Sequence, residues 1–220
     1  MSQIETLEEE IDPQRNARIE KILSAAYELF SKRGIEDVAM TDIADRSKIG
    51  VASLYRYFET KEILVVKTAT QAWEFQMQEV LPSLLRPKYK NSSGYDQLQE
   101  IFALFIRLYE KETDFLRFIY LFDAFAVKEK IPKEAMANYE AKILLVKQII
   151  SDAIQKGFDD GSISDKYKDY GEMLYFTLMH TFFSVAQKLS LSGKLLDMDT
   201  KKNGSMQLKL LAEVLLSGLK

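Results

Sequence analysis

The sequence predicts an all-α protein of about nine helices. Along most of the 220 residues, apolar side chains recur at intervals of three and four, the spacing of a helix with one buried face. The chain has only four prolines and nine glycines and is rich in Leu, Ile, Lys and Glu, which favours helices. No turn signal joins two alternating segments into a β-hairpin. A chain of this length can bury one sizeable core or two smaller ones.

The first predicted helix follows a short acidic segment. Asp12 and Pro13 can start it, and Gly34 can end it. Between them, apolar residues at the i, i+3, i+4 spacing form one buried stripe. The stripe consists of Ile19, Ile22, Leu23, Ala26, Leu29 and Phe30. This helix is therefore expected to pack its apolar side against the elements that follow.

Two shorter helices and a tight turn come next. Thr41 and Asp42 open the second helix, residues 47–50 turn the chain, and the third helix covers residues 51–58. A helix, a tight turn and a second short helix in this order predict a helix-turn-helix. In DNA-binding proteins this motif places its second helix in the major groove.

The third helix carries residue types that suit a DNA groove. Leu54 and Phe58, four positions apart, should face the other two helices, while the opposite side carries small residues, Arg56 and flanking tyrosines. Small side chains allow close approach to base edges, and Tyr and Arg can donate hydrogen bonds to phosphate. We expect DNA contacts from this helix, the turn before it and the starts of two neighbouring helices, at Thr41, Lys48, Gly50, Val51, Ala52, Ser53, Tyr55, Arg56, Tyr57 and Lys61.

Separate roles are expected within this set. Thr60 can cap a fourth helix, which puts Lys61 at a positive helix end that suits a phosphate. Tyr55 is also assigned to phosphate, and both residues would position the protein without reading sequence. Val51 and Ser53 are assigned to base edges, Val51 to a thymine methyl group.

The runs AA..LF...G, then IA, then LYRYF..KE.L resemble the N-terminal signature of the tetracycline-repressor (TetR) family of bacterial regulators. The resemblance covers residues 15–67 and involves many positions at fixed offsets. It implies an all-helical homodimer with an N-terminal helix-turn-helix and a larger C-terminal domain that binds a small effector and releases the DNA.

Two positions depart from the family's pattern. Lys48 stands where the family commonly has the glycine of the turn, and Ala39 stands where it commonly has a Ser or Thr cap. Because a left-handed Lys costs about 1 kcal/mol, either Gly50 carries the unusual backbone dihedral or the turn differs slightly. Thr41 is expected to replace the phosphate contact usually made at the start of the second helix.

Three regions are expected: an acidic flexible tail at 1–14, the helix-turn-helix domain at 15–62, and an effector-binding and dimerisation domain at 63–220. The net charge of −3 is unevenly spread: residues 1–14 hold five acidic and no basic residues, while 15–67 hold more basic than acidic ones. The local face, rather than the net charge, decides phosphate binding. The tail is expected to be a solvated segment, and limiting non-specific DNA binding is the alternative.

The C-terminal region is expected to contain six helices in sequence. The fourth helix should run through residues 73–81 until Pro82 and Pro87 break it, and 86–94 should form a loop. The following helices are expected near residues 98–109, 115–125, 132–156, 166–192 and 201–218.

The last two of these, the eighth and ninth helices, are apolar over more than one face. Burying one face in the core and another against a partner would explain that excess. By resemblance, these two helices would pair with their copies as a four-helix dimer interface. The alternative is that both are well-buried core helices of a monomer.

An aromatic block between the fifth and eighth helices is the candidate effector pocket. A pocket is expected to hold isolated polar groups among apolar ones. The candidates are Phe102, Phe105, Tyr109, Phe118, Phe122, Asp123, Tyr139, Phe176 and His180. The alternative is that the aromatic residues are plain core. An apolar or aromatic effector is expected, or a cationic one if Asp123 faces the cavity.

Several classes of function are not expected. With no cysteine, the chain has no disulfide, no thiolate nucleophile and no Cys-ligated metal. His180 is its only histidine and is expected to be a hydrogen-bonded interior residue rather than a metal ligand, and common enzyme motifs are missing. We expect no catalytic site, no metal and no cofactor. No apolar run approaches the roughly 20 residues needed to span a bilayer, so a cytoplasmic protein is expected.

The expected function is that of a dimeric repressor bound to a pseudo-palindromic operator in double-stranded DNA and released by a small molecule. Two recognition helices related by a two-fold axis require such an operator. The alternative is a DNA-binding protein of the same architecture that is controlled by a protein partner.

Overall fold

The computed structural model describes residues 13–191 and 203–220, and within these ranges the protein is all-α, as predicted. The described part contains ten α-helices and one 3₁₀ helix, without a strand. These elements are α1 (Pro13–Arg33), α2 (Met40–Ser47), α3 (Val51–Phe58), α4 (Lys61–Leu84), α5 (Pro87–Asn91), α6 (Gly94–Lys111), α7 (Thr113–Lys128), α8 (Lys133–Asp159), η1 (Asp165–Tyr170), α9 (Gly171–Leu191) and α11 (Gly204–Ser217).

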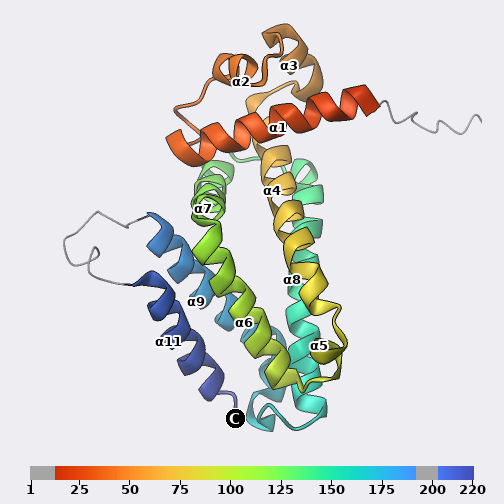
Figure 1. The fold of residues 1–220 in the computed structure, drawn as a ribbon, viewed down its shortest axis with the longest axis vertical. Helices are drawn as coiled ribbons and strands as arrows, with labels where there is room; N and C mark the ends of the chain where they lie inside the picture. The colour runs from red at the N-terminus through yellow and green to blue at the C-terminus, as the bar shows by residue number, and fades with distance from the viewer. Residues whose placement is uncertain (1–12, 192–202) are drawn as a thin grey trace, which may run out of the picture.

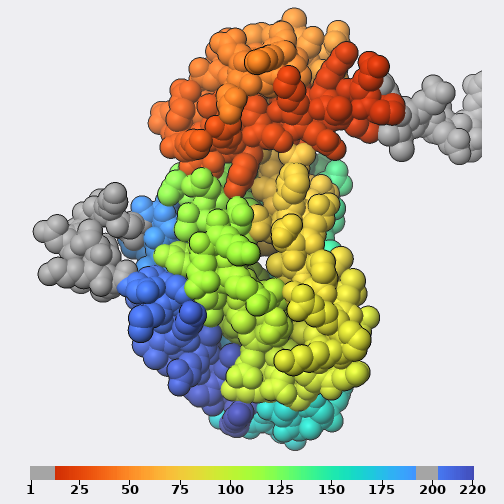
Figure 2. All heavy atoms as spheres, in the orientation of Figure 1, coloured from red at the N-terminus to blue at the C-terminus, as the bar shows by residue number. Residues whose placement is uncertain are grey.

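The helices form two parts (Figure 1). In the first, which we call the reading unit, α2 and α3 pack on one side of α1. In the second, the long helices α4, α6, α7, α8, α9 and α11 form an elongated bundle. α1 lies across the ends of α4 and α7 and contacts both. The space-filling view shows the reading unit seated on one end of the bundle (Figure 2).

The three helices of the reading unit match their expected positions closely. α3 has the predicted bounds, and α1 buries Ile22, Leu23, Ala26 and Phe30 of its predicted stripe. α1 nevertheless begins at Pro13, two residues before the expected domain boundary, and α4 crosses the expected boundary at 62 without a break. The expected tail lies almost entirely outside the described residues.

The predicted break at Pro82 is wrong, because Pro82 lies inside α4. A proline removes one helical hydrogen bond, and here the helix ends two residues later, so the loss falls in the last turn. The expected loop at 86–94 is also wrong in part. Pro87 occupies the first position of the short helix α5, where its missing N–H costs nothing.

The eighth predicted helix begins differently from expectation. Residues 165–170 form the 3₁₀ helix η1, and the α-helix starts only at Gly171. The ninth predicted helix corresponds to α11, which starts at Gly204. The predicted end at 192 and start at 201 lie outside the described residues.

One continuous apolar core extends from the reading unit into the bundle. At the junction, Phe118 of α7 stacks on Phe30 of α1, with ring centroids 6.1 Å apart, and meets Tyr27 edge-on at 5.4 Å. Phe30 and Phe118 are both fully buried, and burying each contributes about 1.5–3 kcal/mol. The reading unit is therefore held by α7 as well as by its covalent link to α4.

Candidate nucleic-acid interface

The outward face of α3 is the surface that the sequence assigned to DNA. Leu54 and Phe58 are fully buried against the rest of the reading unit. Ala52, Tyr55 and Arg56 are exposed, whereas Val51, Ser53 and Tyr57 are partly buried at the flanks of the same face. Arg56 lies over the Tyr57 ring, 5.8 Å from its centroid. The helix thus presents small and hydrogen-bonding groups away from the core.

The turn before α3 places its strain on Lys48. Lys48 has φ 56° and ψ 42°, the left-handed conformation, while Gly50 is extended at φ −60° and ψ 140°. The expectation that Gly50 carries the unusual dihedral is therefore wrong. The Lys48 N–H donates to the Asp45 carbonyl at 3.2 Å, and the Ile49 N–H to the Ala44 carbonyl at 3.0 Å. These bonds close α2 in the geometry that glycine usually provides.

Replacing Lys48 by glycine should separate folding from binding. Lys48→Gly is expected to raise the free energy of unfolding by up to about 1 kcal/mol, because it relieves the left-handed strain. The same change removes a positive charge from the surface beside α3 and should lower the salt dependence of DNA binding by about one counterion. Thermal denaturation and gel-shift titrations at several salt concentrations measure the two effects. A fall in thermal stability together with a fall in DNA affinity would contradict this expectation.

The start of α2 is capped by a residue other than its N-cap. Ala39 has no side-chain acceptor, but the Asp42 carboxylate accepts the Ala39 N–H at 2.9 Å. Arg33 of α1 donates to the same carboxylate oxygen at 3.2 Å, which balances its charge. Thr41 is exposed in this first turn. The start of α2 is thus stabilised despite the alanine, and Thr41 is left at the surface.

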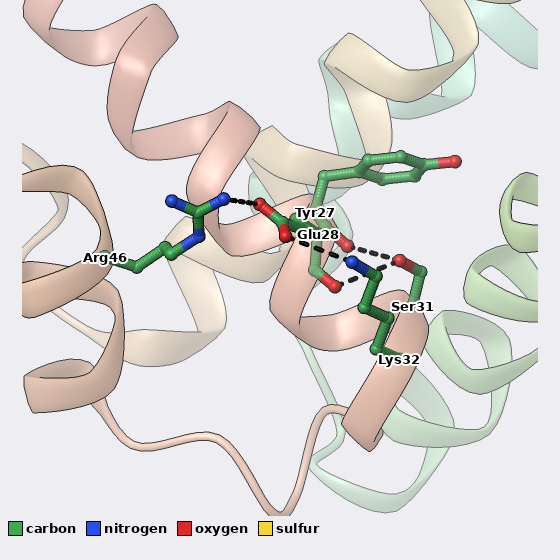
Figure 3. Close-up of polar contacts among 5 residues, drawn as sticks. All are labelled: Tyr27, Glu28, Ser31, Lys32 and Arg46. Atoms are coloured by element: carbon green, nitrogen blue, oxygen red, sulfur yellow. Dashed lines mark hydrogen bonds and ion pairs between the residues drawn. The ribbon is translucent and has the colours of Figure 1, made fainter.

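A second ion-pair network fixes α2 against α1 (Figure 3). Glu28 of α1 accepts from Arg46 of α2 at 2.5 Å and from Lys32 at 3.1 Å. Hydrogen bonds from Lys32 and then Arg46 hold the pKa of Glu28 below its usual value. The backbone carbonyls of Tyr27 and Glu28 also accept the Ser31 hydroxyl. Of these contacts, the Arg46–Glu28 ion pair joins α2 to α1.

A shallow positively charged depression lies beside α3, and we call it the basic hollow. Its volume is about 300 Å³, and it is lined by Arg18, Lys21, Lys48, Ile49, Ser53 and Tyr57. The lining holds three cations from two elements and no carboxylate. The Arg18 guanidinium, by hydrogen bonding and by its charge, lowers the pKa of the Tyr57 phenol. The arrangement suits a phosphate group next to the recognition helix.

Sequence reasoning did not select Arg18 and Lys21 as contacts. Both lie on the exposed side of α1, three residues apart, opposite the buried stripe. Their spacing places them on one face, but only the packing of α1 against α2 shows that this face adjoins Lys48. A basic pair on the polar face of the first helix is the signal that was available.

Lys61 lies apart from the basic hollow. Thr60 caps α4 as predicted, accepting the Ile63 N–H at 3.3 Å. The Lys61 ammonium, however, donates to the Glu36 carbonyl in the loop between α1 and α2, at 3.4 Å. Partial burial lowers its pKa, against the opposing effect of nearby carboxylates. This ammonium supports the loop, and the geometry does not favour its expected phosphate contact.

Most of the expected effector-pocket residues line neither of the two spaces described below. Phe102, Phe118 and Phe122 are packed in the core. Tyr139 is also buried; its hydroxyl accepts the indole N–H of Trp73 at 3.3 Å. Tyr109 is partly buried and lines neither of these two spaces.

Three of these residues lie at the surface, against expectation. Phe176 and His180 are exposed on α9, with ring centroids 5.3 Å apart, so His180 is not an interior residue. Asp123 is exposed on α7, although surrounding protein atoms displace enough water to raise its pKa to about 6. Since α9 is apolar on two faces, periodicity could not show which face is inside.

Of the nine expected residues, Phe105 lines one of the two spaces described here for residues 13–191 and 203–220. This small space between α4, α6 and α8, which we call the inner cavity, has a volume of about 50 Å³. Its lining is apolar apart from one amide and one indole N–H and consists of Trp73, Gln76, Met77, Val80, Leu84, Ile101, Leu104, Phe105, Leu108, Val146, Ile149 and Ile150.

A larger depression, the outer groove, adjoins the inner cavity and has a volume of about 560 Å³. The surface is hollowed between α4 and α6 (Figure 2). Both spaces share Gln76, Val80, Leu104 and Leu108. The groove also reaches Ser24 and Tyr27 of α1 and carries mixed charges from Glu79, Arg107, Lys111 and Glu112. It therefore touches both parts of the molecule.

The bundle also exposes an apolar surface, which we call the outer apolar face. It consists of Met173 and Phe176 on α9 and Met206, Leu210 and Val214 on α11. The three α11 residues lie four positions apart and are 67%, 61% and 60% exposed. α9 and α11 pack against each other, so these side chains belong to neighbouring helices. Apolar residues grouped in this way mark interaction surfaces.

Two further properties concern residues 13–191 and 203–220 only. Within them, no helix combines the length and apolar character needed to cross a membrane. The same ranges contain no cluster of three or more His, Asp or Glu side chains placed to hold a metal ion.

Comparison with known proteins agrees with the geometry. Residues 22–67 match the family model described as bacterial regulatory proteins, tetR family. The chain is 22% identical, over 72% of its length and 79% of the relative's, to the biofilm operon icaADBC HTH-type negative transcriptional regulator IcaR of Staphylococcus aureus.

Solved structures show the same fold. A TetR transcription regulator from Haloarcula marismortui has a TM-score of 0.68 at 15% identity, covering 93% of this chain and 98% of that one. Thermus thermophilus FadR, solved in complex with lauroyl-CoA, has a TM-score of 0.60 at 21% identity, covering 92% and 95%.

Proposed function

Since the chain belongs to the TetR family of transcriptional regulators, we propose that it acts as a homodimeric repressor that binds a pseudo-palindromic operator and is released by a predominantly apolar effector. The observation that carries this proposal is the exposed face of α3 beside the basic hollow. A helix with small outward residues and an adjacent cationic site matches a major groove and its flanking phosphate.

The contacts divide into positioning and reading. Val51, Ala52 and Ser53, in the first turn of α3, are assigned to base edges, because N-terminal residues of a recognition helix reach deepest into the groove. Phosphate contacts are assigned to Thr41, Gly50, Tyr55, Arg56 and Tyr57, together with the cations of the basic hollow, Arg18, Lys21 and Lys48. The assignment to Lys61 is replaced by these α1 cations.

The dimer is assigned to the outer apolar face. Residues that would lie in water in a single chain would be buried against the same residues of a second copy, as in a two-fold interface. Burial of exposed apolar surface contributes roughly 25 cal/mol per Å² before the costs of association. α9 and α11 would then form a four-helix interface with their copies and fix the distance between the two α3 helices.

The effector is assigned to the inner cavity and the adjoining outer groove. The apolar lining favours an apolar chain or ring, and FadR bound to lauroyl-CoA is a fold neighbour whose ligand has such a chain. Asp123 lines neither space, so the earlier reason for a cationic effector disappears. Because the groove reaches both α1 and α4, an occupant would favour one orientation of the reading unit over another.

Blocking the passage between the two spaces should uncouple DNA release from effector. Leu104→Trp places a larger side chain where Leu104 now lines both the cavity and the groove. Overpacking is expected to cost about 1–3 kcal/mol of stability, with operator affinity retained. Isothermal titration with lauroyl-CoA, and gel shifts with and without it, measure the response. Unchanged release in the variant would place the effector elsewhere.

Selection of duplexes from a random pool by the full-length protein tests the proposal as a whole. The expected result is a pseudo-palindromic sequence bound by a dimer, with affinity that falls steeply as salt rises. Selection of a single asymmetric half-site bound by a monomer would contradict it. If the protein binds an operator well but no apolar compound releases it, we would conclude that a protein partner, and not a small effector, controls DNA binding.

A further inference from the structure

Arg117 on α7 joins the ends of two helices that belong to different parts of the molecule. Its Nη1 donates to the Ser31 carbonyl in the last turn of α1, at 3.4 Å. Its Nη2 donates to the Ser190 carbonyl in the last turn of α9, also at 3.4 Å. Asp114, one turn earlier on α7, accepts from Nη1 at 3.1 Å and holds the guanidinium in place.

The chemistry of these acceptors explains why an arginine lies there. The last carbonyls of a helix have no N–H partner within it and form the negative end of its dipole. Arg117 donates to a carbonyl in the last turn of each of two helices. A guanidinium offers several N–H groups in one plane and can serve both ends together, whereas a lysine ammonium is a compact point charge on a flexible stem.

Other contacts also join α7 to the reading unit. Phe118 packs between Tyr27 and Phe30 of α1, and Lys128 pairs with Glu36 of the following loop at 2.6 Å. On its other side, α7 packs along α9. α7 therefore lies between the reading unit and a helix that carries part of the outer apolar face.

We infer that Arg117 is a positioning residue that sets the orientation of α1, and thereby of α3, relative to α9. This inference rests on the proposed dimeric operator binding. If α9 lies at the dimer axis, Arg117 ties each reading unit to that axis by a route separate from α4. Its role is to fix the distance between the two α3 helices, and it makes no contact with DNA.

The dependence of affinity on half-site spacing tests this role. The selected operator is compared with versions that have one base pair added or removed between half-sites, since a rigid dimer demands one spacing. Wild type is expected to bind the altered operators at least tenfold more weakly. Arg117→Met, which keeps an unbranched apolar stem, should bind the original about tenfold more weakly, in the range of allosteric coupling, and should barely distinguish the spacings.

Two further readouts separate positioning from other roles. The salt dependence of binding should be unchanged in Arg117→Met, because no phosphate contact is lost. Arg117→Lys keeps the positive charge but lacks the planar guanidinium, so its discrimination between half-site spacings should lie between those of wild type and Arg117→Met. If Arg117→Met does not fold, Arg117→Lys provides the test. Arg86→Met is the matched control: Arg86 is exposed just before α5 and lines neither the outer groove nor the inner cavity.

The outcomes are distinct. Spacing discrimination in both Arg117 variants equal to that of wild type would overturn the inference and leave the proposed function standing. A wild-type protein that binds all spacings equally would instead contradict the rigid dimer itself. A reduced salt dependence in Arg117→Met would reassign Arg117 to a phosphate contact.

Discussion

Reversing the two α1 charges in the basic hollow is expected to abolish specific DNA binding. Arg18→Glu combined with Lys21→Glu leaves Lys48 as the only cation there and places two carboxylates beside the phosphate path. Affinity for the operator should fall at least about 100-fold at moderate salt, because two charge-assisted contacts are replaced by repulsion. Both side chains are exposed, so the free energy of unfolding should change little.

Gel-shift titrations over a range of salt concentrations measure this effect. The matched control is Lys166→Glu with Lys168→Glu, which changes the net charge equally on η1, at the bundle end remote from the reading unit (Figure 1). That control should keep most of the affinity. If both double variants bind equally, the loss would reflect net charge, and the basic hollow would have no specific role.

Placing a charge in the outer apolar face is expected to separate the dimer. Leu210 is 61% exposed in the single chain and lies between Met206 and Val214 on α11. In Leu210→Arg, two guanidinium groups related by the dimer axis would be buried near each other. Burial of unpaired charge costs several kcal/mol, so the dimer dissociation constant should rise at least about 100-fold. Operator affinity should fall with it.

Sedimentation equilibrium measures the dissociation constant, and circular dichroism checks that the variant stays helical. Leu85→Arg is the matched control, because Leu85 is 56% exposed at the end of α4 and lies outside the outer apolar face. It should remain dimeric. If Leu210→Arg remains dimeric, the dimer interface must lie on another surface.

The reading unit was predictable because its signals are local. The burial of Leu54 and Phe58 follows from their spacing of four within one short helix. The start of α4 follows from Thr60, whose side chain caps the helix. The basic hollow was only half predictable. Lys48 lies in the motif, but Arg18 joins it through the packing of two helices, which no spacing along one helix encodes.

The bundle shows why the inner cavity and the outer groove were not predictable. Aromatic side chains mark core and cavity alike, and only packing decides which of them leave space. One contact that controls this packing is Gly94, where a Cβ would lie 2.0 Å from the Gly157 backbone nitrogen. This glycine lets the start of α6 approach α8, yet the sequence placed it at the edge of a loop. Likewise, the sequence predicted a helix end at Pro82, whereas α4 continues two residues further, to Leu84.

Two α3 helices, related by a two-fold axis, are proposed to enter the major groove. Protection of guanine N7 from dimethyl sulfate measures this directly, because that atom lies in the major groove. We expect two clusters of protected guanines, related by the operator's dyad and centred about one helical turn or a multiple apart. A single protected cluster, or no protection of guanine N7 in the bound operator, would contradict it.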